Sequence, residues 1–236
     1  MGEIPSEFAR YSRQIALESF GEEAQKNLKS ARAVLAGAGG VGSAIVGLLA
    51  GSGVGKIDII DCDEVSVSNL HRQTLYKEAQ VGESKARLAA KYAMELNSQC
   101  LARAFCGKIQ DSAELARFLK GADVCIDATD SFITRFAVSD ACRSLNLPLV
   151  YAAAKGFVSQ VVLLWRNFYL REIVPDKGAQ KEEPARLPIF PASAHLSGVL
   201  AAGIAIRFLA KTENFDFGKF LSFDFSSGKF KEMKLR

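Results

Sequence analysis

The sequence lacks both a strong charge imbalance and an apolar N-terminal run. Its 30 lysine and arginine residues are matched by 26 aspartate and glutamate residues, which leaves a formal net charge of only +4. Because the positive charges are spread along the chain, we do not expect a nucleic-acid partner. Residues 1–10 contain no hydrophobic core of the kind found in secretory signals, so we expect a soluble, cytoplasmic protein.

Long hydrophobic runs are also few. The segment from Leu187 to Ile206 has no charged residue, but it contains Pro188, Pro191 and His195. Prolines and polar side chains at this density argue against a membrane span, so no membrane contact is expected.

Paired cysteines are missing as well, because none of the five cysteines belongs to a CxxC motif. Four of them lie in or beside apolar runs, where a reduced thiol packs as a small hydrophobic side chain. We therefore expect all five to be structural. They are Cys62, Cys100, Cys106, Cys125 and Cys142.

Short apolar runs alternate with stretches of helical periodicity along most of the chain. The predicted strands are Ala33–Leu35, Ile57–Ile60, Leu101–Phe105, Val124–Ile126, Leu149–Ala152 and Val161–Trp165. The predicted helices include Ile45–Leu49, Ser84–Asn97, Asp111–Lys120 and Thr134–Leu145, with Ser84 and Asp111 as N-caps. This alternation predicts an α/β fold with a Rossmann-like, mostly parallel sheet flanked by helices.

The last third of the chain has a different composition. Charged residues and prolines in Arg166–Pro191 predict a long loop, which is either a functional lid or disordered. A helix of small residues is expected at Ser197–Ala210. A hairpin of Leu221–Phe225 and Lys229–Met233 would add an antiparallel extension to the sheet.

A glycine-rich turn follows the first predicted strand and opens a helix. Its glycines are Gly37, Gly39, Gly40 and Gly42, in a G-x-G-x-x-G pattern. Such glycines allow close backbone approach to phosphate, and the helix N-terminus attracts the anion. Asp61 ends the second strand, where a carboxylate can accept hydrogen bonds from ribose hydroxyls. The context predicts a nucleotide site.

More polar side chains are expected near the same crevice. They are Asp63, Asn69, Arg72, Gln73, Lys85 and Asp130. Ligands of an open parallel sheet bind beyond the carboxyl ends of the strands, where Asp61 and Asp130 both fall. Cations and a spare carboxylate suit a triphosphate with its metal, whereas NAD needs neither.

Plainer interpretations exist for some of these residues. Arg72 could form a surface ion pair, and Asp130 could cap the following helix. Lys85 opposes the dipole of its helix unless an anion lies nearby. His71 and His195 are expected to be satisfied polar residues rather than catalysts.

In combination, the motifs resemble those of the ThiF/MoeB/HesA adenylyltransferase family, which is related to ubiquitin-activating enzymes. The resemblance runs from about Arg10 to the C-terminus and rests on Arg10-Tyr11-Ser12-Arg13-Gln14, the glycine turn, Asp61-x-Asp63, Ser68-Asn69-Leu70-x-Arg72-Gln73, Gly82 with Lys85, and Thr129-Asp130. It implies that Asp61 holds the ribose, Arg72 and Lys85 the phosphates, and Asp130 a Mg²⁺ ion. It also implies that Arg13 enters the site of a second subunit, in a homodimer.

The resemblance further implies an activity. The expected reaction is ATP-dependent adenylation of the C-terminal carboxylate of a ubiquitin-like sulfur-carrier protein with a Gly-Gly end, of the ThiS/MoaD type, for thiamine or molybdopterin biosynthesis. We expect one adenylyltransferase domain over residues 1–236: a helical arm at 1–30, the nucleotide-binding core at 31–153, and a carrier-binding part at 154–236 with a loop at 166–193.

The chain also departs from the family pattern. Many relatives bind zinc through two CxxC pairs, but no cysteine follows Cys142, so no structural zinc is expected. The loop Arg166–Pro191 has no thiol either, so adenylation alone is expected, without a thioester step. The alternatives are a nucleotide-binding paralogue without turnover, a tRNA-modifying dehydratase of the same superfamily and, less favoured, an NAD-dependent oxidoreductase.

Overall fold

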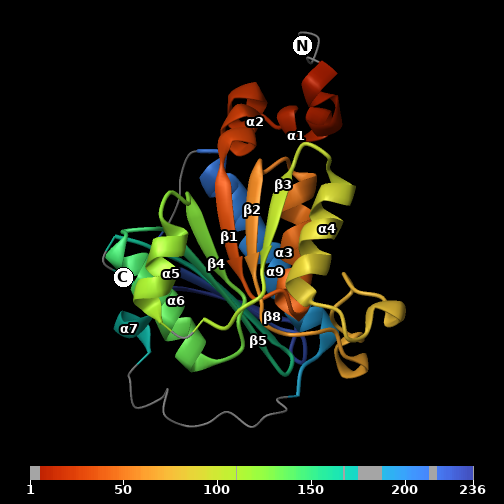
Figure 1. Ribbon diagram of the computed structural model, residues 1–236. Helices are drawn as coiled ribbons and strands as arrows, with labels where there is room; N and C mark the ends of the chain where they lie inside the picture. Colours follow the sequence, from red (N-terminus) through yellow and green to blue (C-terminus); the bar gives the residue numbers. More distant parts are fainter. Residues whose placement is uncertain (1–5, 110, 167, 175–187, 213–216, 236) are drawn as a thin grey trace.

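An eight-stranded sheet forms the centre of the computed structural model, which describes residues 6–109, 111–166, 168–174, 188–212 and 217–235. The strand order is β3-β2-β1-β4-β5-β6-β7-β8 (Figure 1). The strands are β1 Arg32–Ala36, β2 Lys56–Ile60, β3 Leu101–Phe105, β4 Val124–Asp127, β5 Leu149–Lys155, β6 Val158–Leu164, β7 Lys219–Asp224 and β8 Lys229–Lys234.

The sheet has a parallel part and an antiparallel part. Strands β3, β2, β1, β4 and β5 run parallel, whereas β6, β7 and β8 are joined by antiparallel pairing. The sheet confirms the predicted α/β class with its C-terminal antiparallel extension. The predicted hairpin is confirmed as β7 and β8.

Helices cover both faces of the sheet. They are α1 Ser12–Ile15, α2 Gly21–Ser30, α3 Gly40–Gly51, α4 Lys85–Leu96, α5 Ser112–Leu119, α6 Phe132–Ser144, α7 Leu170–Ile173 and α9 Pro191–Leu209, with 3₁₀ turns η1 Ser6–Tyr11, η2 Val67–Asn69 and η3 Glu78–Gln80. Two apolar cores result, one under α3, α4 and α9 and the other under α5 and α6. Both predicted N-caps are present: Ser84 Oγ accepts from Arg87 N at 3.5 Å, and Asp111 Oδ1 from Ala113 N at 2.8 Å.

The predicted long loop needs correction at both of its ends. Helix α7 lies near its start, and α9 begins at Pro191 rather than at the predicted Ser197. Proline is favoured in the first turn of a helix because its missing N–H group has no partner to lose there. Residues 175–187, most of the predicted loop, lie outside the described residues.

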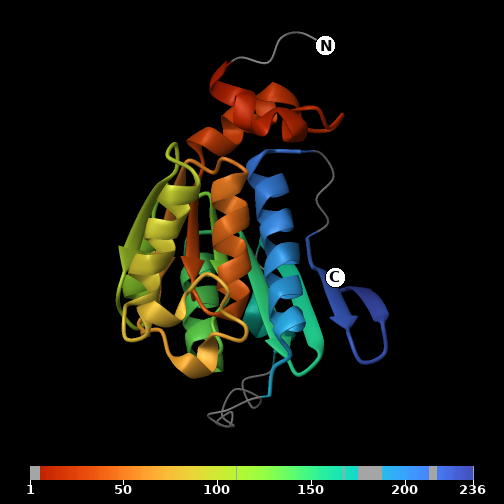
Figure 2. The ribbon, with the colours of Figure 1, turned by 90° about the vertical axis from the view of Figure 1, so that its right-hand side faces the viewer.

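Helix α9 is a core element of the fold. By length and composition it could cross a membrane, but it lies beside α3 over the sheet (Figure 2). The two helices approach closely at Gly198, where a Cβ atom would stand only 2.9 Å from the Cβ of Ala44. The apolar composition of α9 is therefore explained by its packing against α3 and the sheet.

The strand order positions the site. Strand β1 lies between β2 and β4. From β1 the chain first forms β2 and β3 on one side, and it then crosses over to form β4 and β5 on the other side. At such a switch point the loops that follow the two central strands diverge and leave a crevice beyond their carboxyl ends. In this fold those loops follow β1 and β4, and they carry the glycine turn and Asp130.

Candidate functional site

The glycine turn is built so tightly that only glycine fits at two positions. Gly37 has a φ of +92°, and a Cβ atom there would lie 2.7 Å from the carbonyl oxygen of Ala128. A Cβ atom on Gly42 would come closer than 3.0 Å to the carbonyl oxygen of Gly37. The turn therefore passes directly against the loop after β4, and it leads into the N-terminus of α3, which favours an anion.

Asp61 fixes the shape of this turn from the end of β2. Its Oδ2 atom accepts a hydrogen bond from Ala38 N at 2.7 Å, and its Oδ1 atom accepts one from Asp63 N at 2.8 Å. Burial raises the pKa of Asp61, although these two hydrogen bonds and the charge of Lys85 act in the opposite direction. Each carboxylate oxygen keeps a further lone pair that can accept from a ribose hydroxyl.

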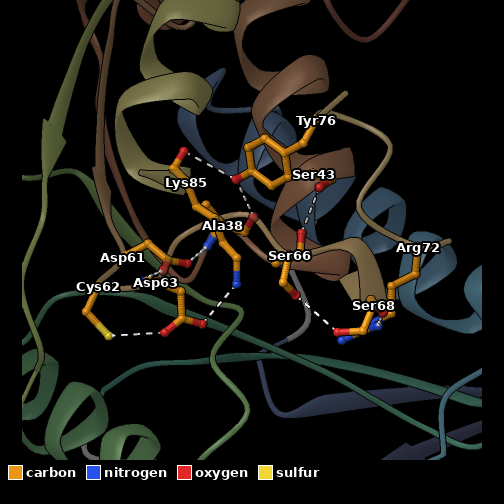
Figure 3. Close-up of polar contacts among 11 residues, drawn as sticks. Ala38, Ser43, Asp61, Cys62, Asp63, Ser66, Ser68, Arg72, Tyr76 and Lys85 are labelled. Carbon is orange, nitrogen blue, oxygen red and sulfur yellow. Dashed lines mark hydrogen bonds and ion pairs between the residues drawn. The ribbon is translucent and has the colours of Figure 1, made fainter. Parts of the chain in front are cut away.

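Lys85 is the first residue of α4 and is only 4% exposed. Its Nζ atom lies 2.9 Å from Asp63 Oδ2 (Figure 3). Burial alone would raise the pKa of Asp63, but the hydrogen bond and charge of Lys85 outweigh it and the pKa is lowered. Asp63 is thus the anion that makes a buried cation tolerable at this helix N-terminus.

Tyr76 is a site residue that the sequence did not predict. Its buried hydroxyl donates to Ala38 O at 2.7 Å and lies 3.3 Å from Lys85 O. Burial and the nearby carboxylates Asp61 and Asp63 raise its pKa, so it stays a neutral donor. It ties the glycine turn to the start of α4. No local pattern marks this tyrosine, because its partners are backbone carbonyls that only the fold brings to it.

The segment after η2 packs against the glycine turn. The backbone N–H groups of Arg72 and Gln73 donate to Asn69 O at 3.1 and 3.0 Å. A Cβ atom on Gly40 would lie 3.2 Å from Arg72 Cγ, and one on Gly39 would lie 3.5 Å from Gln73 Nε2. Asn69 therefore organises the turn through its carbonyl oxygen, while Arg72 and Gln73 contact the glycines directly.

Arg72 and Asp130 interact electrostatically across the crevice. Partial burial lowers the pKa of Arg72, and the negative charge of Asp130 counteracts this effect. The capping interpretation of Asp130 finds no support, because the N-cap of α6 is Ser131 and no side-chain cap hydrogen bond forms there. The structure thus gathers Arg72, Lys85 and Asp130 around the glycine turn.

Arg13 lies far from this cluster. It is exposed on α1, and the neighbouring Tyr11 accepts a hydrogen bond from Asn97 at 2.8 Å, just beyond the last turn of α4. Lys85 begins that helix, and twelve helical residues span about 18 Å. The structure does not bring Arg13 to the site of its own chain. His195, expected to be a satisfied polar residue, has Nε2 3.0 Å from Arg72 O.

Among the described residues, a possible metal-ligating group is formed by Asp61, Cys62 and Asp63, whose ligand atoms lie within 4.8 Å of one another. Lys85 already neutralises Asp63, which makes this group less suited to a cation. Asp130 is exposed. Mg²⁺ usually binds through one or two carboxylates together with substrate phosphates, so the lone carboxylate of Asp130 fits that ion.

The five thiols divide into two sets. Cys100, Cys125 and Cys142 are buried, and burial raises the pKa of Cys100 to about 11. Cys62 and Cys106 are exposed near the carboxyl ends of β2 and β3. Burial and the charges of Asp61 and Asp63 raise the pKa of Cys62, which disfavours a reactive thiolate.

Known proteins are similar to this chain in sequence and in fold. The model of the ThiF family matches residues 11–236. The adenylyltransferase and sulfurtransferase MOCS3 of Anopheles gambiae is 34% identical over 237 residues, which cover 98% of this chain and 53% of that protein. The sulfur carrier protein adenylyltransferase of Thermus thermophilus is 40% identical over 157 residues, covering 66% of this chain and 58% of that protein.

A solved structure extends the likeness to the fold. The microcin C7 biosynthetic enzyme MccB in complex with N-formylated MccA has a TM-score of 0.86 and 25% identity, covering 98% of this chain and 74% of that one. The chain spans about half the length of the curated relatives it matches.

Proposed function

The chain belongs to the ThiF family, and we propose that it uses ATP and Mg²⁺ to adenylate the C-terminal carboxylate of a ubiquitin-like sulfur-carrier protein with a Gly-Gly end. The observation that carries the proposal is the gathering of Arg72, Lys85 and Asp130 around a glycine turn that opens a helix. The relatives named as sulfur carrier protein adenylyltransferase and as MOCS3 support the substrate class.

The reaction needs no general base. A chain-terminal carboxyl group has a pKa of about 3.3–3.7 and is therefore ionised at neutral pH. Its oxygen attacks the α-phosphorus of ATP, a new O–P bond forms, and the bond to the bridging oxygen breaks so that pyrophosphate leaves. Catalysis is then a matter of alignment and of offsetting charge on the phosphate oxygens.

Each part of the site has a role in this scheme. The turn amides and the N-terminus of α3 would bind phosphate, and Asp61 would hold the ribose. Arg72 and Lys85 would offset the charge of the phosphate chain, with Lys85 released from Asp63. Asp130 would hold Mg²⁺, which when bound supplies positive charge to the phosphate oxygens.

The carrier would dock on residues 154–236. Three exposed phenylalanines lie there, beside the carboxyl end of β5: Phe157 is 50% exposed, Phe190 39% and Phe225 36%. Their rings contact in series, with centroids 5.1 Å apart for Phe157–Phe190 and 5.5 Å apart for Phe190–Phe225. Strand β5 pairs with β4, after which Asp130 follows, so this apolar surface adjoins the crevice.

The proposal includes a homodimer, and the position of Arg13 supports it. This residue is exposed at the far end of α4 from Lys85, so the nucleotide site it would serve is that of a second copy of the chain. The same proposal includes a cytoplasmic location and no structural zinc, since the chain has no cysteine after Cys142. Stoichiometric zinc in purified protein would contradict the last point.

The decisive experiment is exchange of labelled pyrophosphate into ATP in the presence of a sulfur-carrier protein. Arg72→Ala and Asp130→Ala should each lower exchange at least about tenfold, because a charge-assisted contact to phosphate contributes about 1.5–3 kcal/mol. Arg117→Ala, which removes an exposed arginine on α5, is the matched control and should exchange like wild type. Exchange at the wild-type rate in both site variants would refute the assignment. ATP binding without any exchange by the wild type would instead indicate a scaffold without turnover.

A further inference from the structure

A buried polar group lies directly behind Asp130, and the proposed reaction does not use it. Asp127 ends β4 and is completely buried, and Arg135 in α6 is 7% exposed. Both hold the same residue. Asp127 Oδ1 accepts from Thr129 N at 2.9 Å and from Thr129 Oγ1 at 2.7 Å. Arg135 Nη2 donates to Thr129 O at 2.5 Å.

Thr129 is therefore held at three atoms: its backbone nitrogen, its hydroxyl and its carbonyl oxygen. Because the carbonyl and the next nitrogen belong to one planar peptide, fixing Thr129 O also fixes the orientation of the peptide that enters Asp130. Asp130 itself is exposed, and it is not the N-cap of α6, which is Ser131. The backbone from which its side chain projects is thus oriented by the contacts of the preceding residue.

Two features indicate that this arrangement is kept at a cost to stability. Asp127 Oδ2 and Arg135 Nη1 are buried without a hydrogen-bond partner among the described residues. Each of these atoms loses its hydration without gaining a hydrogen bond, although the charge of Arg135 acts favourably on Asp127. Arg135 also lies near the N-terminus of α6, where a positive charge opposes the helix dipole. It is supported on its other side by the ring of Tyr151, at 4.7 Å from the centroid.

We propose that Asp127 and Arg135 form a clamp on Thr129 that aims the Asp130 carboxylate at Mg²⁺, so that both act as positioning residues. This inference rests on the proposed function, in which Asp130 holds the metal. Because both residues of the clamp are buried, the clamp would contact neither nucleotide nor carrier. Its loss should therefore weaken the use of Mg²⁺ while leaving metal-free contacts of ATP with the glycine turn intact.

Thr129 offers the sharpest test. Thr129→Val removes the hydroxyl donor and keeps the shape, whereas Thr129→Ser keeps the donor. We expect Thr129→Val to raise the Mg²⁺ concentration for half-maximal pyrophosphate exchange at least about fivefold, and Thr129→Ser to stay near wild type. Arg135→Lys should behave like Thr129→Val. Arg143→Lys is its control on the same helix, because Arg143 forms a half-exposed ion pair with Glu172 at 2.6 Å.

Calorimetry of ATP binding with Mg²⁺ and with EDTA gives a readout independent of turnover. Affinity should fall in Thr129→Val and Arg135→Lys only when Mg²⁺ is present, at a temperature where thermal unfolding shows each variant to be folded. An unchanged Mg²⁺ response, or an equal loss of affinity in EDTA, would overturn the clamp. If wild type binds Mg²⁺ and ATP but does not exchange pyrophosphate, the proposed function fails, and the calorimetric comparison still decides the clamp.

Discussion

Replacing Gly42 by alanine should separate nucleotide binding from folding. Both Gly42 and Gly47 belong to α3, and neither has a positive φ, so alanine is compatible with the local backbone at both positions. Their surroundings differ. A Cβ atom on Gly42 would come closer than 3.0 Å to Gly37 O, whereas one on Gly47 would lie 3.6 Å from the nearest atom, the Tyr92 hydroxyl oxygen.

The magnitudes follow from these contacts. Alanine gains about 0.8–1.0 kcal/mol over glycine inside a helix. At Gly47 this gain should raise the free energy of unfolding by roughly that amount. At Gly42 it is offset by the cost of overpacking, about 1–3 kcal/mol, so the net loss should be about 0–2 kcal/mol. The clash forces the Gly37 carbonyl away from α3 and so misplaces the amides that would face phosphate.

A single amide–phosphate hydrogen bond contributes about 1.5–3 kcal/mol, so Gly42→Ala should raise the Kd for ATP about 10- to 100-fold. Gly47→Ala should leave that Kd unchanged. Titration calorimetry measures the affinities, and thermal unfolding measures the stabilities. A Gly42→Ala Kd within threefold of wild type would refute the view that the turn binds phosphate through its close packing against α3.

Two further predictions concern stability and assembly. Asp58 is 1% exposed, and its carboxylate accepts hydrogen bonds from Arg103 Nε at 2.7 Å and Arg32 Nε at 2.8 Å. Burial raises its pKa, but the two arginines outweigh burial and lower it below 3.8. Asp58→Asn should therefore lower the free energy of unfolding, measured in urea, by about 2–3 kcal/mol. This loss should be complete above pH 3.8 and should shrink as the pH falls through the lower pKa of the native state. A stability difference that does not change with pH in the acid range would contradict this. Co-expressed Arg13→Ala and Arg72→Ala chains should regain exchange that neither homodimer shows, and failure to regain it would argue against sharing of sites between subunits.

The glycine turn and its partners could be predicted because their signals are local. The glycines precede a helix, Asp61 ends a strand, and Lys85 follows an N-cap serine. Strand direction is a different matter. The apolar period of β5 and β6 does not reveal their antiparallel pairing, which depends on a reversal at Gly156, where φ is +56°. The sequence predicts the start of α9 at Ser197 instead of Pro191, because a proline is equally compatible with the end of a loop and with the first turn of a helix.

Tyr76 and Arg135 could not be found from sequence for a related reason. Each acts on a backbone carbonyl: Tyr76 on Ala38 O, 38 residues away in the chain, and Arg135 on Thr129 O, six residues before it. Carbonyl groups carry no residue identity, so no pair of side chains marks the contact. The charged residues that are proposed to face the ligand have signals in the sequence, whereas the groups that hold them in place are found only in the folded structure.

Lys85 shows why this holding matters. A buried ammonium at a helix N-terminus is unfavourable on two counts, desolvation and the helix dipole, and Asp63 offsets both at 2.9 Å. Because Asp63 is largely exposed, water and a competing polyanion can reach the pair from one side. A triphosphate seated on the glycine turn would offer Lys85 more negative charge than one carboxylate does. In the proposed function the ion pair would keep the lysine in position before the nucleotide arrives, so ATP would have to drive an exchange of partners rather than folding of the site.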